Sequence, residues 1–158
     1  MSGKGAPIAA TEIDGTGLRV VVVAASWHDT IMDGLVAGAA RVLDASGADW
    51  TLARVPGSFE LAVAAQAAFA GGADAVVALG VIIRGGTPHF EYVSSAATDG
   101  LNRVSLDAGK PIGFGLLTLD DEQQGLNRAG LPDSEEDKGA EAADAALRTA
   151  AVISALRG

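Results

Sequence analysis

The sequence predicts an α/β protein in which helices cover a parallel sheet. Apolar, β-branched runs alternate along the chain with longer amphipathic stretches, an order typical of parallel α/β layers. The run from Asp74 to Ile83, DAVVALGVII, is apolar at consecutive positions, as expected for a strand that is covered on both faces. With 158 residues, of which 49% are hydrophobic, the chain is long enough for one domain with a substantial core, placed at residues 18–158.

The first half of the chain contains two strand patterns and two helix patterns after a polar start. Residues Met1 to Gly17 are rich in small and polar side chains, which predicts an arm that precedes the domain and is either loose or paired against a sheet edge. The run LRVVVVAA predicts a strand from Leu18 to Ala25, and an amphipathic stretch predicts a helix from Thr30 to Ala45. The run WTLARV then predicts a strand from Trp50 to Val55, followed by an alanine-rich helix from Phe59 to Ala70.

The second half repeats the alternation. The buried strand runs from Ala75 to Ile83 and leads into an amphipathic helix from His89 to Asp107. The run IGFGLLTL predicts a strand from Ile112 to Leu119, and a short helix is expected from Glu122 to Ala129. After an acidic gap, a last helix is expected from Lys138 to Leu156.

Composition excludes several classes of function. A formal net charge of -9 disfavours nucleic acid and acidic membranes, so an anionic ligand would have to be held by local features such as Arg84, Arg128 or helix N-termini. The absence of cysteine excludes disulfides, a thiol nucleophile and thiolate metal sites, and it fits a reducing compartment, for which we expect the cytoplasm. We expect no membrane insertion, because no apolar run approaches spanning length, and no export, because the N-terminal residues lack the hydrophobic core of a signal peptide.

Three loops that follow predicted strands carry the candidate functional residues. Right-handed crossovers place all strand-to-helix loops of a parallel sheet at one edge, where open α/β folds bind ligands. Trp27 follows the first strand, and Ser58 and Glu60 follow the second. An exposed indole stacks well on a flat ring, and the hydroxyl and carboxylate suit a polyol. The edge therefore suits a heterocycle with a polyol, with a phosphate on the third loop.

The third loop lies in the segment Val81 to Tyr92, VIIRGGTPHFEY. Its glycine pair, Gly85-Gly86, permits left-handed or close-approach backbone, and Thr87 followed by Pro88 predicts an N-cap and a first helical residue. Free backbone N–H groups at this helix start would favour a phosphate. The same dipole disfavours a charged imidazole, so we expect His89 to be neutral and able to exchange protons.

Each of these residues also has a purely structural explanation. Trp27 would cover the end of the core, Ser58 with Glu60 would cap a helix, and the third loop would be an ordinary capped turn. His28 has no obvious partner, and we expect it to be a surface loop residue.

With two histidines on different loops and no cysteine, the sequence predicts no metal site.

Six segments of the chain together match a known pattern. They are VVVAASWHDTIMDGLVAGA, RVPGSFELAVAAQ, DAVVALGVIIRGGTPHFEYV, PIGFGLLT, EQQGLNRAG and DKGAEAADAAL. In their order and spacing they resemble the 6,7-dimethyl-8-ribityllumazine synthase family of riboflavin biosynthesis. The resemblance runs from about Leu18 to the last helix, and α/β folds in general do not share its combination of motifs.

The resemblance implies a fold and a reaction. The fold would be a flavodoxin-like three-layer sandwich, with a four-stranded parallel sheet of order 2-1-3-4 and helices on both faces. The reaction would condense 5-amino-6-(D-ribitylamino)uracil with 3,4-dihydroxy-2-butanone 4-phosphate, releasing phosphate and water. It is the penultimate step of riboflavin biosynthesis, and the family uses neither a cofactor nor a metal.

The resemblance also assigns roles within one subunit. His89 would transfer protons while the amine of the substrate forms an imine, phosphate leaves and the ring closes. The phosphate of the butanone would bind at Gly86 and Thr87. The ribitylaminouracil would be held by three parts of the chain: Trp27 stacked on the ring, the turn of Ser58, Phe59 and Glu60 at the ribityl chain, and the backbone of Val81, Ile82 and Ile83 at the uracil.

By the same resemblance, a neighbouring subunit completes the site. The matching positions are Phe114 for the ring, Arg128 for the phosphate, and Lys138. This implies a homo-oligomer with shared active sites. Family members that form icosahedral shells carry a Lys-Ala-Gly-Asn-Lys-Gly type turn before the last helix, whereas this chain has the acidic LPDSEEDKG. The departure favours a pentamer over a 60-subunit shell, and it leaves a dimer of pentamers open.

Other classes of function remain at this stage. A relative that binds flavin or lumazine without catalysis would be signalled by a missing His89 or phosphate loop, and both are present. A structural shell would be signalled by the shell turn, which is absent. On the fold alone, the alternative is a flavodoxin-like protein that binds a phosphosugar.

Overall fold

The structure is a computed structural model that describes Gly5 and residues 13–158. The expected arm, Met1 to Gly17, therefore lies outside the described residues except for Gly5 and residues 13–17. Within this last stretch, the backbone N–H of Gly15 donates to the carbonyl of Ser46 over 2.8 Å, and Ile13 packs against the core. These residues are thus attached to the domain.

A four-stranded parallel sheet forms the centre of the fold. Its order is β2-β1-β3-β4, which confirms the predicted flavodoxin-like topology. The strand β3 is buried along almost its whole length, as its continuous apolar run predicted. The strands are β1 (Arg19–Ala25), β2 (Asp49–Val55), β3 (Ala75–Ile83) and β4 (Ile112–Leu119).

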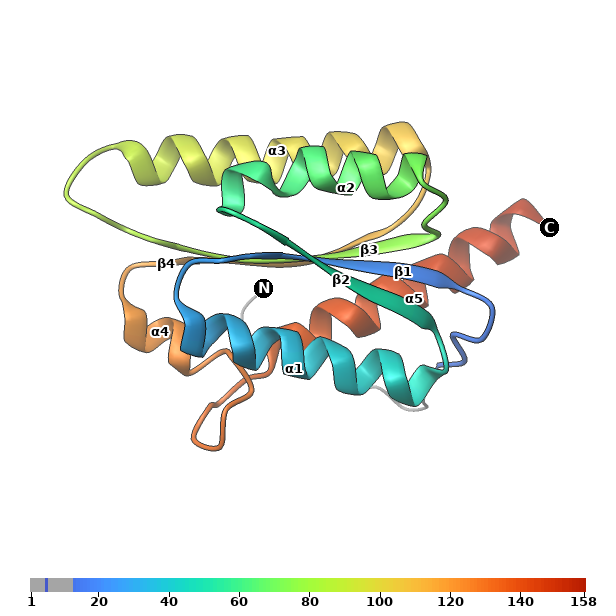
Figure 1. Cartoon of the computed structure of the whole chain (residues 1–158), viewed down its shortest axis with the longest axis horizontal. Coiled ribbons are helices and arrows are strands. Elements are labelled where there is room, and N and C mark those ends of the chain that lie inside the picture. Colours follow the sequence, from blue (N-terminus) through green and yellow to red (C-terminus); the bar gives the residue numbers. More distant parts are fainter. Residues whose placement is uncertain (1–4, 6–12) are drawn as a thin grey trace.

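Helices cover both faces of this sheet, so the molecule has three layers (Figure 1). On one face lie α2 (Leu61–Ala70) and α3 (His89–Ala108), and on the other lie α1 (Asp29–Ser46), α4 (Glu122–Leu126) and α5 (Lys138–Arg157). A separate apolar cluster fills each interlayer space. Among the described residues, no helix is both long and apolar enough to span a membrane.

Small residues bring α1 and α5 into close contact. A Cβ added at Gly139 of α5 would overlap the backbone of Leu35 on α1, and one added at Gly38 would overlap the carboxylate of Asp137. Gly113 of β4 similarly lies against the backbone of Ala142. The abundant glycine and alanine therefore serve close packing within the subunit.

Two predicted helices differ from the structure. The helix expected from Phe59 begins as a 3₁₀ turn, η1 (Ser58–Glu60), and becomes α-helical only at Leu61. The short helix expected to reach Ala129 ends at Leu126, because the chain then pairs with the segment before α5. This pairing forms an isolated antiparallel bridge between Ala129 and Asp137, which the sequence pattern did not reveal.

Candidate active site

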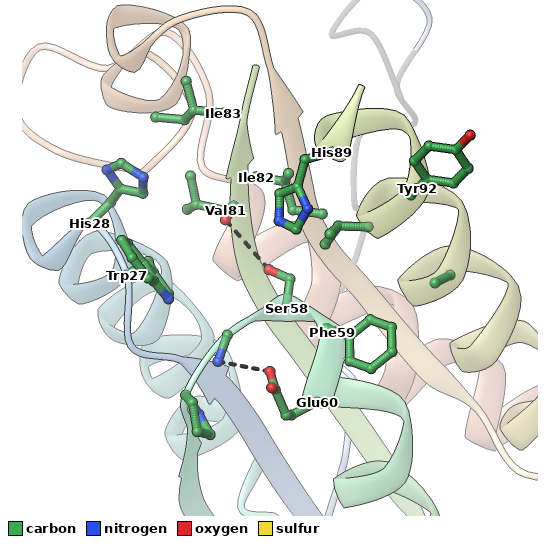
Figure 2. Close-up of a pocket in the computed structure, with 14 residues that line it drawn as sticks. Trp27, His28, Ser58, Phe59, Glu60, Val81, Ile82, Ile83, His89 and Tyr92 are labelled. Carbon is green, nitrogen blue, oxygen red and sulfur yellow. Dashed lines mark hydrogen bonds between the residues drawn. The ribbon is translucent and has the colours of Figure 1, made fainter. Parts of the chain in front are cut away.

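A pocket of about 890 Å³ lies at the carboxyl edge of the sheet. The three loops that follow β1, β2 and β3 meet there, as the topology predicted, and the start of α3 closes one side (Figure 2). The pocket lining is mainly apolar with a few polar groups, an arrangement that suits a small organic ligand. Its residues are Trp27, His28, Pro56, Gly57, Ser58, Phe59, Glu60, Val81, Ile82, Ile83, His89, Tyr92, Val93 and Ala96.

The turn after β2 is fixed by two hydrogen bonds. The buried Ser58 hydroxyl donates to the carbonyl of Val81 over 3.4 Å. A carboxylate oxygen of Glu60 accepts from the backbone N–H of Gly57 over 3.1 Å (Figure 2). The capping explanation of Glu60 is therefore confirmed, whereas Ser58 does not cap a helix. Both side chains nevertheless line the pocket, so a structural role and a binding role coexist here.

The loop after β1 presents an aromatic side chain to the pocket. Trp27 is 66% exposed, so the expectation that it covers the end of the core is wrong. His28, which we expected to be a surface loop residue, also lines the pocket, and its ring lies 6.5 Å from that of Trp27. Its backbone is left-handed, with φ 62°, and is the only positive φ outside glycine among the described residues.

The loop after β3 differs from its predicted geometry. Gly85 and Gly86 are not in the left-handed region, although both are exposed and a Cβ on either would meet no atom within 4 Å. Pro88, not Thr87, occupies the N-cap position of α3, and no side chain caps this helix. Without a cap, N–H groups of its first turn keep hydrogen-bonding capacity for a ligand.

His89 is the first residue of α3, and its ring points from the helix into the pocket (Figure 2). It approaches from the side opposite Trp27 and His28. The arrangement places a group that can carry a proton beside an apolar space bordered by an indole and by the Ser58 hydroxyl. Such a site can orient a flat ring and move protons on its substituents.

Arg84, one of the candidate anion-binding residues, is already paired. Its guanidinium donates to Glu91 over 2.5 Å and to Asp120 over 3.1 Å. These hydrogen bonds, first that of Asp120 and then that of Glu91, raise the pKa of Arg84 above its usual value. Two carboxylates therefore balance its charge, and the structure does not support the expected role for Arg84 in holding an anion.

Five predicted site residues lie outside the pocket lining. Gly86 and Thr87 belong to the exposed loop at the start of α3. Phe114 lies on the edge strand β4 and is 51% exposed. Arg128 and Lys138 lie on the opposite side of the sheet, near the junction with α5.

Arg128 and Lys138 form one charged cluster with two glutamates. The Lys138 amine lies 3.1 Å from Glu136 and 2.7 Å from Glu141, and Arg128 lies 4.0 Å from Glu136. Burial of Lys138 acts to lower its pKa, but the hydrogen bonds with Glu141 and Glu136 outweigh it and raise the pKa above its usual value. Lys138 is therefore held as a cation.

Several pocket residues were absent from the predicted site. Tyr92 was detectable, because it follows His89 by one helical turn and so lies on the same face of α3. His28 lies in the loop after the first predicted strand but was set aside because the sequence showed no partner for it. The described residues contain no group of three or more side chains suited to a metal ion. The other additions are Pro56, Gly57, Val93 and Ala96.

Comparison of the sequence with known proteins identifies the family of this chain. The family model for 6,7-dimethyl-8-ribityllumazine synthase matches residues 17–154. A protein of that name from Leifsonia xyli subsp. xyli (strain CTCB07) is 73% identical over 158 residues, covering all of both chains. Namesakes from Clavibacter sepedonicus and Clavibacter michiganensis subsp. michiganensis (strain NCPPB 382) are 72% and 71% identical, covering all of this chain and 99% of theirs. The chain belongs to the 6,7-dimethyl-8-ribityllumazine synthase family.

Proposed function

We propose that this protein condenses 5-amino-6-(D-ribitylamino)uracil with 3,4-dihydroxy-2-butanone 4-phosphate to give 6,7-dimethyl-8-ribityllumazine. The observation that carries the proposal is the family match over residues 17–154, together with one pocket that contains Trp27, Ser58, Glu60 and His89. Phosphate and water are the other products, and the reaction is a step of riboflavin biosynthesis. The cytoplasm is the proposed site of action, since the chain has no cysteine.

The pyrimidine substrate fits the apolar part of the pocket. Trp27 stacks on its ring, and the backbone of Val81 to Ile83 contacts its uracil edge. The turn from Ser58 to Glu60 holds the ribityl chain. This assignment is supported by the side-by-side placement of these segments along the pocket wall (Figure 2).

The phosphate of the second substrate binds at Gly86 and Thr87 in this proposal. The uncapped first turn of α3 lies next to them, and a helix N-terminus attracts anions through its free N–H groups and its dipole. The open space around Gly86 leaves room for a phosphate close to the backbone.

The chemistry needs no nucleophile from the protein. The amine of the ribitylaminouracil attacks the ketone and forms an imine with loss of water, and phosphate then leaves. The nitrogen that carries the ribityl chain closes the ring on the remaining carbonyl carbon with loss of a second water, which gives the lumazine. His89 transfers protons during these steps, and neither a cofactor nor a metal takes part. Because the two substrates supply the amine and the carbonyl, most of the acceleration comes from holding them together.

A neighbouring subunit completes the site in this proposal. Phe114, Arg128 and Lys138 do not line the pocket of their own subunit, yet the first is an exposed aromatic residue and the other two are cations. A ring of five subunits places them at the pocket of the next subunit. The acidic segment before α5 favours this pentamer over a larger shell.

The test is to mix the purified protein with both substrates and to follow the fluorescence of the lumazine against a protein-free control. The control is needed because an amine and a ketone can condense without an enzyme. We expect acceleration that falls in Arg128→Ala and His89→Ala. An assembled oligomer that gives no acceleration but binds lumazine or flavin would point instead to a binding protein without catalysis.

A further inference from the structure

Arg84 connects three elements around the start of α3. It directly follows β3, and its backbone N–H donates to the carbonyl of Leu119 at the end of β4 over 2.8 Å. Its side chain then reaches Asp120, just beyond β4, and Glu91 in the first turn of α3. The arginine therefore joins the ends of two strands to the helix that carries His89.

The contacts of this guanidinium balance its charge and also fix the orientation of its plane. Besides the two carboxylates, the ring of Phe90 lies under it, with 4.3 Å from the guanidinium carbon to the ring centroid. Phe90 in turn packs against the apolar cluster beneath α2 and α3. The anchor at Asp120 is also held, because its backbone N–H donates to the side chain of Gln124 over 2.8 Å.

Apart from Arg84 and the packing of Phe90, the surroundings of the first turn of α3 are open. The preceding loop contains Gly85 and Gly86, around which a Cβ would meet nothing within 4 Å, and no side chain caps the helix. His89 itself is exposed. Its two successors in the chain, Phe90 and Glu91, are both held by Arg84. His89 thus directly precedes two residues that Arg84 contacts.

We propose that Arg84 is a positioning residue, whose guanidinium holds the first turn of α3 so that the His89 imidazole and the phosphate loop keep their places at the pocket. This inference rests on the proposed function, in which His89 transfers protons. The pyrimidine is held by the loops after β1 and β2 and by the backbone of Val81 to Ile83, which belongs to β3 and not to the first turn of α3. Arg84 therefore acts on proton transfer and on phosphate binding but not on pyrimidine binding.

The experiment uses the assembled oligomer with Arg84→Lys, which keeps the charge but cannot make the planar set of contacts. Glu91→Gln and Asp120→Asn each weaken one contact at an exposed position. Arg103→Lys is the control, because Arg103 also lies on α3 and pairs with one exposed carboxylate, Asp107, at 3.5 Å.

We expect Arg84→Lys to lower kcat by between about 10-fold and 100-fold, as a small displacement of a catalytic group does. The KM for the butanone phosphate should rise, and the KM for the ribitylaminouracil should stay unchanged. Glu91→Gln and Asp120→Asn should show the same pattern more weakly, and Arg103→Lys should behave as the unmodified protein. An unchanged kcat in Arg84→Lys, or a parallel rise in both KM values, would overturn the inference.

A second readout does not depend on activity. The chain contains two histidines, so protein labelled on its histidine rings gives two imidazole signals by NMR, assigned with His28→Asn. Arg84→Lys should shift the signal of His89 and leave that of His28 in place. If the unmodified protein makes no lumazine, the proposed function fails, while a selective shift of His89 still supports the positioning role. Two unshifted signals, or two equally shifted ones, would contradict that role.

Discussion

His89 and Trp27 face each other across the pocket, and this placement sets what each is expected to do. In the proposed mechanism the nucleophile belongs to the substrate, so the histidine assists the reaction without initiating it. Trp27 supplies stacking area that is already exposed in the free subunit. The loss of either residue should therefore weaken catalysis or binding without destroying the fold.

Replacement of His89 by alanine should leave measurable activity. General acid–base assistance contributes about 10²–10⁴-fold, and the positioning of the two substrates remains. The measurement is kcat for lumazine formation, with the protein-free rate subtracted. A correctly assembled His89→Ala protein with no activity above that rate would show that the histidine does more than transfer protons.

The fold holds His28 in a left-handed backbone conformation that glycine adopts at lower cost. Its φ of 62° is costly for a residue with a Cβ, and it makes no side-chain cap for α1. His28→Gly should raise the free energy of unfolding by about 0.5–1 kcal/mol, after allowance for the greater entropy of glycine in the unfolded chain. Urea unfolding at one protein concentration measures this, with His28→Ala as the control that should show no gain.

The residues also show where sequence reasoning succeeded and where it failed. Trp27, Ser58 and His89 were predictable, because each lies in or just after a loop that follows a predicted strand. The prediction of an N-cap at Thr87 was wrong. The residue at which a helix begins depends on backbone geometry, and several residue types can adopt that geometry. The pairing of Arg84 was not predictable, because Asp120 is brought to it only by the register of β4 beside β3.

At the scale of elements, the site depends on how closely η1 approaches β3. Gly80 on β3 makes this approach possible, since a Cβ there would lie 2.6 Å from the Ser58 hydroxyl and 3.0 Å from Leu116. The hydrogen bond from Ser58 to Val81 depends on the same spacing. The position of β3 was predictable from its apolar run, but the need for glycine at residue 80 was not, because it arises from contacts with residues distant in the sequence.

Gly80→Ala should therefore affect stability and binding together. Overpacking of this kind costs about 1–3 kcal/mol, and the displaced Ser58 should weaken binding of the ribitylaminouracil. Unfolding by urea and titration with a pyrimidine analogue measure the two effects. Gly86→Ala is the control for stability, because its Cβ would meet no atom of the subunit within 4 Å. Equal effects of both substitutions on unfolding would contradict the packing argument.

The ion pair between Arg84 and Glu91, at the junction of β3 with α3, should stabilise the fold less in acid than at neutral pH. The hydrogen bond from Arg84 lowers the pKa of Glu91 below its usual value of 4.5, so the pair stabilises the fold above that value. The stabilisation is lost as the pH falls through the lowered pKa of the folded state. The difference in unfolding free energy between the unmodified protein and Glu91→Gln should therefore be constant near neutral pH and shrink in acid. A difference that grows in acid would contradict the assignment.

At the scale of the whole molecule, the sheet separates the residues proposed for one reaction. The pocket lies between the strand ends and the start of α3, whereas Arg128 and Lys138 lie on the opposite face, beside α5. Phe59, Tyr92 and Phe114 are exposed apolar side chains on different elements, and in the proposed oligomer they would add contact area for another subunit. The sequence reveals such sharing only through the family resemblance, because periodicity describes a single subunit.

Sharing of sites between subunits predicts complementation by mixed assembly. His89→Ala and Arg128→Ala each weaken every site of a uniform ring, but a ring assembled from both subunits contains sites with an intact His89 from one subunit and an intact Arg128 from its neighbour. For random mixing in equal amounts, about one quarter of the sites are intact in a symmetric ring with one interface per site. Unfolding the two variants together and refolding them should therefore restore lumazine formation above that of either variant refolded alone. If the mixture shows only the mean of the two separate activities, His89 and Arg128 serve the same subunit and the shared site is wrong.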